Sequence, residues 1–146
     1  MNKIEICLEG FENSNHHLQE KTEPFLQAVL KKLEKHNWVV SILFCDNKTM
    51  SLLNKQYRNR DEPTDVLSFI MGETDGDRYI AGDIVISPEM AAENARYFGI
   101  SPEEELRRLL IHGILHLAGN DHECNNEEEP MLVLQEKLLA EIQAEA

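Results

Sequence analysis

The sequence predicts a single domain that mixes β-strands with amphipathic α-helices around one core. The chain has 146 residues, a length that fits one domain able to bury about two-thirds of its unfolded surface. Apolar residues alternate from Lys3 to Leu8, which is the period of a half-buried strand, whereas those from Phe25 to Leu33 recur at helical three- and four-residue steps. Strand and helix patterns continue to alternate, so we expect residues 1–146 to form one domain.

Two strands and two helices are predicted in the N-terminal part of the chain. The strand from Lys3 to Leu8 is followed by a helix that Thr22 caps and that has Pro24 in its first turn. Trp38 to Cys45 is rich in β-branched and aromatic residues, which favours a second strand. That strand ends at Asp46-Asn47, where a short helix begins.

A hairpin and three further helices are predicted in the rest of the chain. Val66 to Ile70 and Ile80 to Ile86 have the composition of strands, and the turn-forming residues Gly72 to Asp77 between them indicate a hairpin. The three helices that follow have their start signals at Ser87-Pro88, Ser101-Pro102 and Pro130.

The composition predicts a cytoplasmic protein that does not bind nucleic acid through a broad basic surface. The net charge is -13, whereas non-specific affinity for nucleic acid comes mostly from Lys and Arg that neutralise phosphates; a local basic cluster is still compatible with this charge. No apolar tract reaches about eighteen residues, and Glu5 and Glu9 stand where a signal peptide would be apolar, so we expect no membrane segment. Three scattered cysteines suit a reducing compartment, with Cys7 and Cys45 as core residues.

Three of the six histidines form a pattern that predicts a metal site. His112 and His116 are four residues apart, so on a helix their rings project from one face. Gly119 stands where a left-handed cap would end the helix, and the reversed chain would return His122 to the same point. Three imidazoles leave the fourth position of a zinc ion open to water, as in catalytic sites. The alternative is a pair of ordinary helix histidines and a loop histidine.

The histidine spacing equals that of the metzincin proteases, His-Glu-x-x-His-x-x-Gly-x-x-His, in which the glutamate is the general base. Gly113 occupies the position of that glutamate here. Without the base, the attack on a planar amide loses its proton acceptor, so the pattern favours hydrolysis of a different substrate. A zinc metallopeptidase is the first alternative function.

This segment resembles the YbeY family of bacterial metal-dependent endoribonucleases, also called rRNA maturation factors. The family motif His-Gly-x-Leu-His-Leu-x-Gly-x-Asp-His is matched from His112 to His122. The other two family signatures are similar to Leu53 to Arg58 followed by Pro63 to Phe69, and to Gly82 to Ser87. Ile70 departs from the family pattern, which usually has proline there.

The resemblance implies an α+β, zincin-like fold with a small mixed four-stranded sheet and about five or six helices, and a role in rRNA maturation and ribosome quality control. It implies one zinc ion per chain on His112, His116 and His122, with single-stranded RNA or an rRNA precursor as substrate. Because the acidic composition predicts weak affinity for bare RNA, we expect small ribosomal subunit proteins to bring the enzyme to its substrate. The resemblance also assigns Arg58 to the RNA phosphate near the metal, so the predicted catalytic residues are Arg58 and His112. From composition alone, an exposed arginine at a helix end is an equal interpretation of Arg58.

The sequence leaves the general base and the attacking group open. Asp65, Asp83 and Asp121 are candidates for the base because their motifs surround the site, although hydrogen bonding at a strand end accounts for Asp65 and Asp83 at least as well. Asp121 also suits a role as the acceptor that fixes an imidazole tautomer. The second alternative function is a non-catalytic ribosome-assembly adaptor that keeps zinc for structure.

Overall fold

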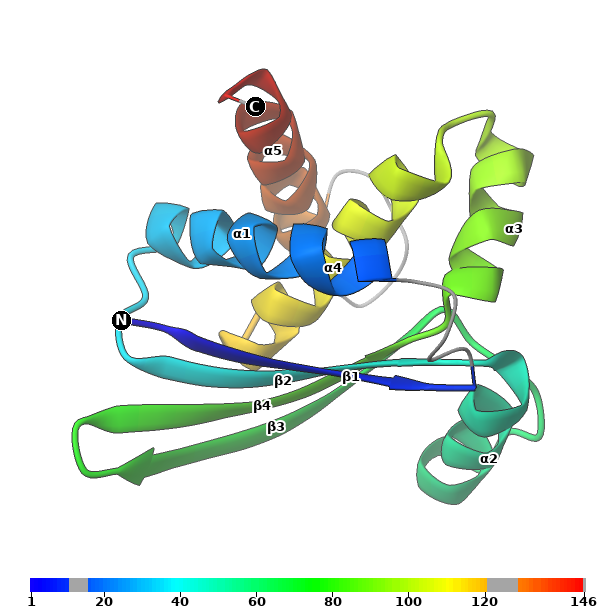
Figure 1. Ribbon diagram of the computed structural model, residues 1–146, viewed down its shortest axis with the longest axis horizontal. Helices are drawn as coiled ribbons and strands as arrows, with labels where there is room; N and C mark the ends of the chain where they lie inside the picture. Colours follow the sequence, from blue (N-terminus) through cyan, green and yellow to red (C-terminus); the bar gives the residue numbers. More distant parts are fainter. Residues whose placement is uncertain (11–15, 121–128, 146) are drawn as a thin grey trace.

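The computed structural model describes residues 1–10, 16–120 and 129–145, and it contains a mixed four-stranded sheet (Figure 1). The strands are β1 (Lys3–Glu9), β2 (Trp38–Cys45), β3 (Val66–Asp75) and β4 (Arg78–Ile86). They lie in the order β1-β2-β4-β3; β2 is parallel to β1 and β4, and β3 is antiparallel to β4 at one edge. The five helices of the described residues are α1 (His16–Lys32), α2 (Asn47–Arg58), α3 (Pro88–Phe98), α4 (Pro102–Leu117) and α5 (Pro130–Glu145). The predicted α+β class and mixed sheet are confirmed.

The sheet separates two apolar clusters of unequal size. Figure 1 shows α1, α3, α4 and α5 on one side of the sheet and α2 on the other. The main core lies under the four helices, and its fully buried side chains include Val29, Leu30, Ile42, Phe44, Ile84, Ile86, Ile111, Ile114 and Leu115. A smaller second core lies under α2 and contains Cys45, Met50, Leu67 and Val85. Successive strand residues alternate between the two cores, as the strand period requires.

The hairpin between β3 and β4 is longer than the sequence pattern predicts. β3 continues to Asp75 and β4 begins at Arg78, so only Gly76 and Asp77 form the turn. Gly72 has φ +63 and lies where the β3–β4 register shifts between Ile70 and Glu73, so this glycine serves an irregularity within the strand. The prediction of a turn from Gly72 to Asp77 was therefore too broad.

Two further expectations are corrected by the fold. Helix α1 begins at His16, so Thr22 lies inside it and is buried, and Pro24 is an internal residue. The earlier start is explained by Leu18, which packs on the main core and extends the apolar stripe by more than one turn. Cys45 is buried and its pKa is raised to about 12, mainly by burial, whereas Cys7 is exposed on β1 and is not a core residue. No helix within the described ranges is long and apolar enough to cross a membrane.

Candidate active site

Helix α4 carries the histidine pair and is fixed at both ends by local hydrogen bonds. The hydroxyl of Ser101 caps its start by accepting from the backbone N–H of Glu104 at 3.1 Å. Gly119 follows the helix at φ +92 and donates to the carbonyl of His116, while the N–H of Asn120 donates to the carbonyl of Leu115. These two bonds form the Schellman arrangement, and the predicted left-handed cap at Gly119 is confirmed.

The two histidine rings converge as a shared metal ion requires. His112 and His116 are half-buried, and their Nε2 atoms are 3.1 Å apart. Two nitrogens that each lie about 2.0–2.1 Å from a tetrahedral zinc ion are separated by about 3.3 Å. The Nδ1 atom of His112 points away from His116 and lies 2.6 Å from Oε1 of Gln135. The chemistry and spacing of these two donors therefore fit a zinc ion.

The third predicted ligand, His122, and the nearby Asp121 lie outside the described residues. Within the ranges that the structure describes, no group of three or more His, Cys, Asp or Glu side chains is arranged to hold a metal. Two of the three predicted ligands are therefore placed, and they lie on one face of α4.

A cleft of about 620 Å³ brings the histidine pair together with residues from four other parts of the chain. Its lining comes from the end of α2, the loop before β3, β3 itself, α4 and α5, and it includes Arg58, Thr64, Asp65, Ser68, Arg108, His112, His116 and Gln135. The predicted catalytic residues Arg58 and His112 thus face one cavity, although they are far apart in the sequence.

The two arginines of the cleft differ in their ion pairing. Arg108 contacts three carboxylates: Glu136 at 2.8 Å, Glu105 at 3.1 Å and Glu104 at 3.4 Å. Arg58 is exposed at the last turn of α2 and makes no ion pair among the described residues. The guanidinium of Arg108 already donates to carboxylates and has little capacity to bind another anion. Of the two arginines, Arg58 is therefore the one suited to bind a phosphate.

The candidate bases Asp65 and Asp83 have different surroundings. Asp65 lines the cleft, but its Oδ1 accepts from the backbone N–H of Val66 at 2.8 Å and its Oδ2 accepts from Asn94 at 3.1 Å. Such hydrogen bonds at the start of a strand are the role that the sequence left open for Asp65 as the alternative to a general base. Asp83 precedes Ile84 on β4, and Ile84 packs under α4, so strand alternation directs Asp83 to the opposite face of the sheet from the histidines. Asp83 is not among the residues that line the cleft.

Sequence reasoning missed Gln135 and Arg108. Gln135 is 7% exposed and lies on the buried face of α5, together with Met131, Leu138 and Ile142. A polar residue at the four-residue step after Met131, within an apolar stripe, was the available signal. Arg108 had no such signal, because its partner Glu136 belongs to another helix.

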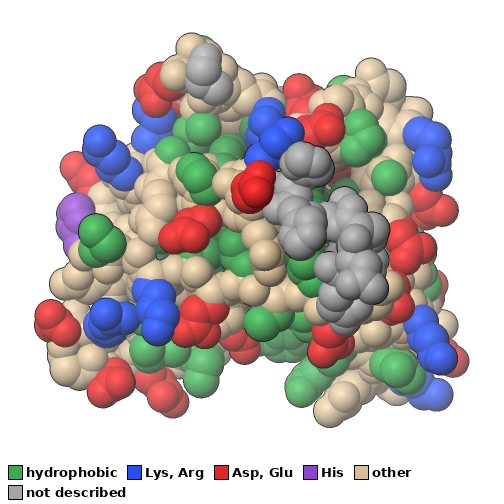
Figure 2. Space-filling view, in the orientation of Figure 1, with side chains coloured by type: hydrophobic (Ala, Val, Ile, Leu, Met, Phe, Trp, Pro, Cys, Tyr) green, Lys and Arg blue, Asp and Glu red, His purple; other side chains and the backbone are tan. Residues whose placement is uncertain are grey.

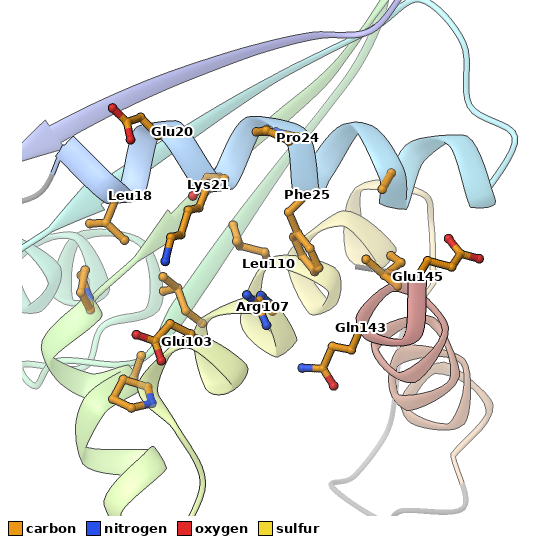
Figure 3. Close-up of a pocket in the computed structure, with 17 residues that line it drawn as sticks. Leu18, Glu20, Lys21, Pro24, Phe25, Glu103, Arg107, Leu110, Gln143 and Glu145 are labelled. Atoms are coloured by element: carbon orange, nitrogen blue, oxygen red, sulfur yellow. The ribbon is translucent and has the colours of Figure 1, made fainter.

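A second cavity, of about 910 Å³, lies between α1, α4 and α5 (Figure 3). Phe25 and Leu110 contribute apolar surface to it, and Lys21, Glu103 and Arg107 contribute charged groups. It is larger than the histidine cleft but includes none of the predicted site residues. Its size alone therefore does not make it the site of chemistry.

Gly113 is buried against β4. This close packing explains why glycine stands here in place of the glutamate that is the general base of the metzincins. A Cβ atom at Gly113 would lie 2.8 Å from both Cδ1 and Cγ2 of Ile84, closer than such contacts occur in proteins. Ile84 is fully buried in the main core, where side chains are closely packed. A glutamate at this position would displace α4 from the sheet, so the peptidase mechanism lacks its base for a structural reason.

We expect Gly113→Ala to destabilise the protein in the presence of Ile84 and to stabilise it when Ile84 is replaced by alanine. Overpacking costs about 1–3 kcal/mol, whereas alanine favours a helix over glycine by about 1 kcal/mol. Ile84→Ala removes the three atoms that lie nearest to the new Cβ. Urea unfolding of the two single variants and the double variant, with chelator present, measures the change of sign. An equal effect of Gly113→Ala in both backgrounds would show that the close approach of α4 is not what selects glycine.

Comparisons with known proteins show which family the chain resembles in sequence and in fold. The family model for the endoribonuclease YbeY matches residues 5–143. Curated proteins named endoribonuclease YbeY are similar to the chain: one from Treponema denticola is 50% identical over 82% of this chain and 80% of its own length, and one from Treponema pallidum is 42% identical over 97% and 90%. A solution structure of a protein from Thermotoga maritima superposes with a TM-score of 0.70, at 36% identity, over 97% of this chain and 90% of that one. The chain therefore belongs to the YbeY family of endoribonucleases.

Proposed function

We propose that residues 1–146 form one hydrolase domain that cleaves single-stranded RNA with one zinc ion held by His112, His116 and His122. Family membership makes the chain an endoribonuclease, a hydrolase of RNA phosphodiester bonds in rRNA processing. The finer assignment of ion and ligands is carried by one observation. The Nε2 atoms of His112 and His116 meet at 3.1 Å inside a cleft that also contains the guanidinium of Arg58.

Each group of the cleft has a distinct role in the cleavage of an RNA phosphodiester. When bound, the ion supplies a Lewis acid for a phosphoryl oxygen and lowers the pKa of bound water. Arg58 binds the non-bridging phosphate oxygens through its fork of N–H donors and stabilises the negative charge that develops on them. Asp65 lines the cleft and holds the start of β3 and Asn94 of α3. The proton acceptor of the reaction is not assigned to Asp65, because both of its oxygens already accept hydrogen bonds.

The charge of the molecule favours a local contact with RNA rather than a broad one. On the face shown in Figure 2, acidic and basic side chains are interspersed, and the whole chain carries a net charge of -13. Helix α2 departs from this composition, because it contains Lys48, Lys55 and Arg58 and no acidic residue. We propose that the RNA backbone binds at the C-terminal end of this helix. The proposed substrates are rRNA precursors in the cytoplasm, and proteins of the small ribosomal subunit supply further affinity.

Arg58→Ala should lower the rate of RNA cleavage by about 10²-fold, the usual effect of removing one donor to a developing oxyanion. Zinc content should stay unchanged, because Arg58 is not a ligand. The cleavage rate of Arg58→Lys should lie between those of Arg58→Ala and the wild type, because lysine retains the charge but not the bidentate geometry. Single-turnover cleavage of a labelled single-stranded RNA, with zinc quantified in each sample, measures these rates.

Arg60→Ala is the matched control for Arg58→Ala. Arg60 is exposed just beyond the end of α2, and it is not among the residues that line the cleft. It should retain most of the wild-type rate. Equal activity of Arg58→Ala and the wild type would refute the phosphate-binding role, and equal losses in both variants would reduce Arg58 to a general contribution of charge.

A further inference from the structure

The side chain of Gln135 connects the histidine pair to an ion pair at the edge of the cleft. Its Oε1 lies 2.6 Å from Nδ1 of His112, and its Nε2 lies 3.1 Å from Oε2 of Glu136. Gln135 is only 7% exposed, and both ends of its amide meet protein groups. A buried amide with both ends bonded has a defined orientation, because flipping it would exchange its donor and its acceptor.

Glu136 decides which way the amide of Gln135 faces. A carboxylate only accepts hydrogen bonds, so the NH₂ group must point to Glu136 and the carbonyl oxygen to His112. The flipped amide would place two acceptor oxygens against each other. Partial burial raises the pKa of Glu136, but hydrogen bonds from Arg108 and Gln135 lower it by more. The net shift of this pKa is therefore downward, and the carboxyl group is ionised at neutral pH.

Arg108 holds the carboxylate of Glu136 in place. Its Nε and Nη2 atoms donate to the two oxygens of Glu136 at 2.8 and 3.0 Å, which is a bidentate pair. Its Nη1 atom donates to Glu105 at 3.1 Å, and Glu105 is nearly buried and also accepts from Asn94. The far end of this hydrogen-bonded chain is therefore anchored on α4 and α3.

The near end of the chain determines the tautomer of His112. The carbonyl of Gln135 only accepts, so the Nδ1 atom of His112 must carry the proton and Nε2 must carry a lone pair. That Nε2 atom is the one that faces His116 at 3.1 Å. A free imidazole favours the opposite tautomer, with its proton on Nε2, where it would block coordination.

We propose that Gln135 is a positioning residue that holds His112 in the Nδ1-protonated, metal-binding tautomer, and that Glu136, fixed by Arg108, sets the orientation of Gln135. This inference rests on the proposed metal site and extends it from the ligands to a hydrogen-bonded chain across α4 and α5. Outer hydrogen-bond partners of this kind typically contribute about 10–100-fold to metal affinity.

Zinc affinity, measured by chelator competition at fixed neutral pH, tests this role without any use of activity. Gln135→Leu has a similar volume and no acceptor, so it should bind zinc about 10–100-fold more weakly. Gln143→Leu makes the same change elsewhere on α5 and should bind zinc like the wild type. In histidine ¹⁵N spectra of the chelated protein, the wild type should show His112 protonated on Nδ1, and Gln135→Leu should shift His112 toward the Nε2-protonated form.

A double variant, Gln135→Glu with Glu136→Gln, keeps the net charge and gives His112 an acceptor again. Glu at 135 accepts from His112 and from the new amide at 136, whose single oxygen accepts from Arg108 in place of the bidentate pair. We expect this exchange to recover the zinc affinity that Gln135→Leu loses, and it keeps the test valid if Gln135→Leu does not fold.

The outcomes separate this inference from the proposed function. Unchanged zinc affinity in Gln135→Leu, or an exchange variant that binds no better than Gln135→Leu, would overturn the positioning role. A wild type that binds zinc but leaves RNA intact would refute the proposed mechanism and leave the positioning role to be decided by the affinities. A wild type that binds no zinc would overturn both.

Discussion

His116→Ala should abolish RNA cleavage, with a loss of at least about a thousandfold. The bound ion contributes several kcal/mol to the stabilisation of the transition state, and each 1.4 kcal/mol or so corresponds to a factor of ten in rate. The Nε2 atom of His116 is one of the two described donors, and its removal leaves His112 without its partner at 3.1 Å. Zinc affinity should also fall by more than the 10–100-fold or so that an outer partner contributes.

The measurement is cleavage of a labelled single-stranded RNA by highly purified protein, with bound zinc quantified in the same samples. His36→Ala is the matched control, because His36 is exposed and outside the cleft, and it should retain full activity. The fold of His116→Ala should survive, because the main core is apolar and does not include the histidines. Equal cleavage by His116→Ala and the wild type would point to a contaminating nuclease. A zinc-loaded wild type without cleavage would favour the adaptor alternative.

Gly82→Ala should destabilise the protein by about 3 kcal/mol or more, the largest effect on folding that we expect from a single methyl group. Gly82 has φ +146, and a Cβ atom there would overlap the backbone carbonyl oxygen of Phe69 and lie 3.0 Å from Leu117. The carbonyl cannot turn away without breaking the pairing of β3 with β4. Because β3 supplies Ser68 and Ile70 to the cleft, the substitution should also weaken the site.

Gly99→Ala is the control that separates a steric clash from backbone strain. Gly99 has φ +70 at the end of α3, and a Cβ atom there would meet no atom within 4 Å. It should cost only about 1–2 kcal/mol, the strain of a left-handed residue. Urea unfolding with chelator present keeps metal binding out of the comparison. Equal costs for the two variants would show that the approach of Phe69 and Leu117 is not what selects glycine at position 82.

The sequence predicted the parts of this protein that depend on neighbouring residues. The four-residue spacing of His112 and His116 placed both rings on one helix face, and Gly119 was correctly interpreted as the helix cap, because both inferences use only local geometry. The four strands followed from periodicity and composition in the same way, whereas the α+β class came from the resemblance of the motifs to a family. Predictions of element ends failed at Thr22 and Gly72, where contacts of Leu18 with the core and a register shift between strands override local signals.

Only the tertiary structure decided what surrounds the histidines. One cleft contains Arg58, Asp65 and Gln135, which come from the end of α2, the start of β3 and the middle of α5. Periodicity along the sequence could not predict that these segments meet. Their meeting depends on how closely α4 packs on β4 at Gly113 and on where α5 crosses it. Side-chain periodicity determines which face of an element is buried, but the partner of a buried polar group is set by packing between elements. For this reason the sequence could predict the three histidines as ligands, whereas the fold supplied the chain of hydrogen bonds from Arg108 through Glu136 and Gln135 to His112.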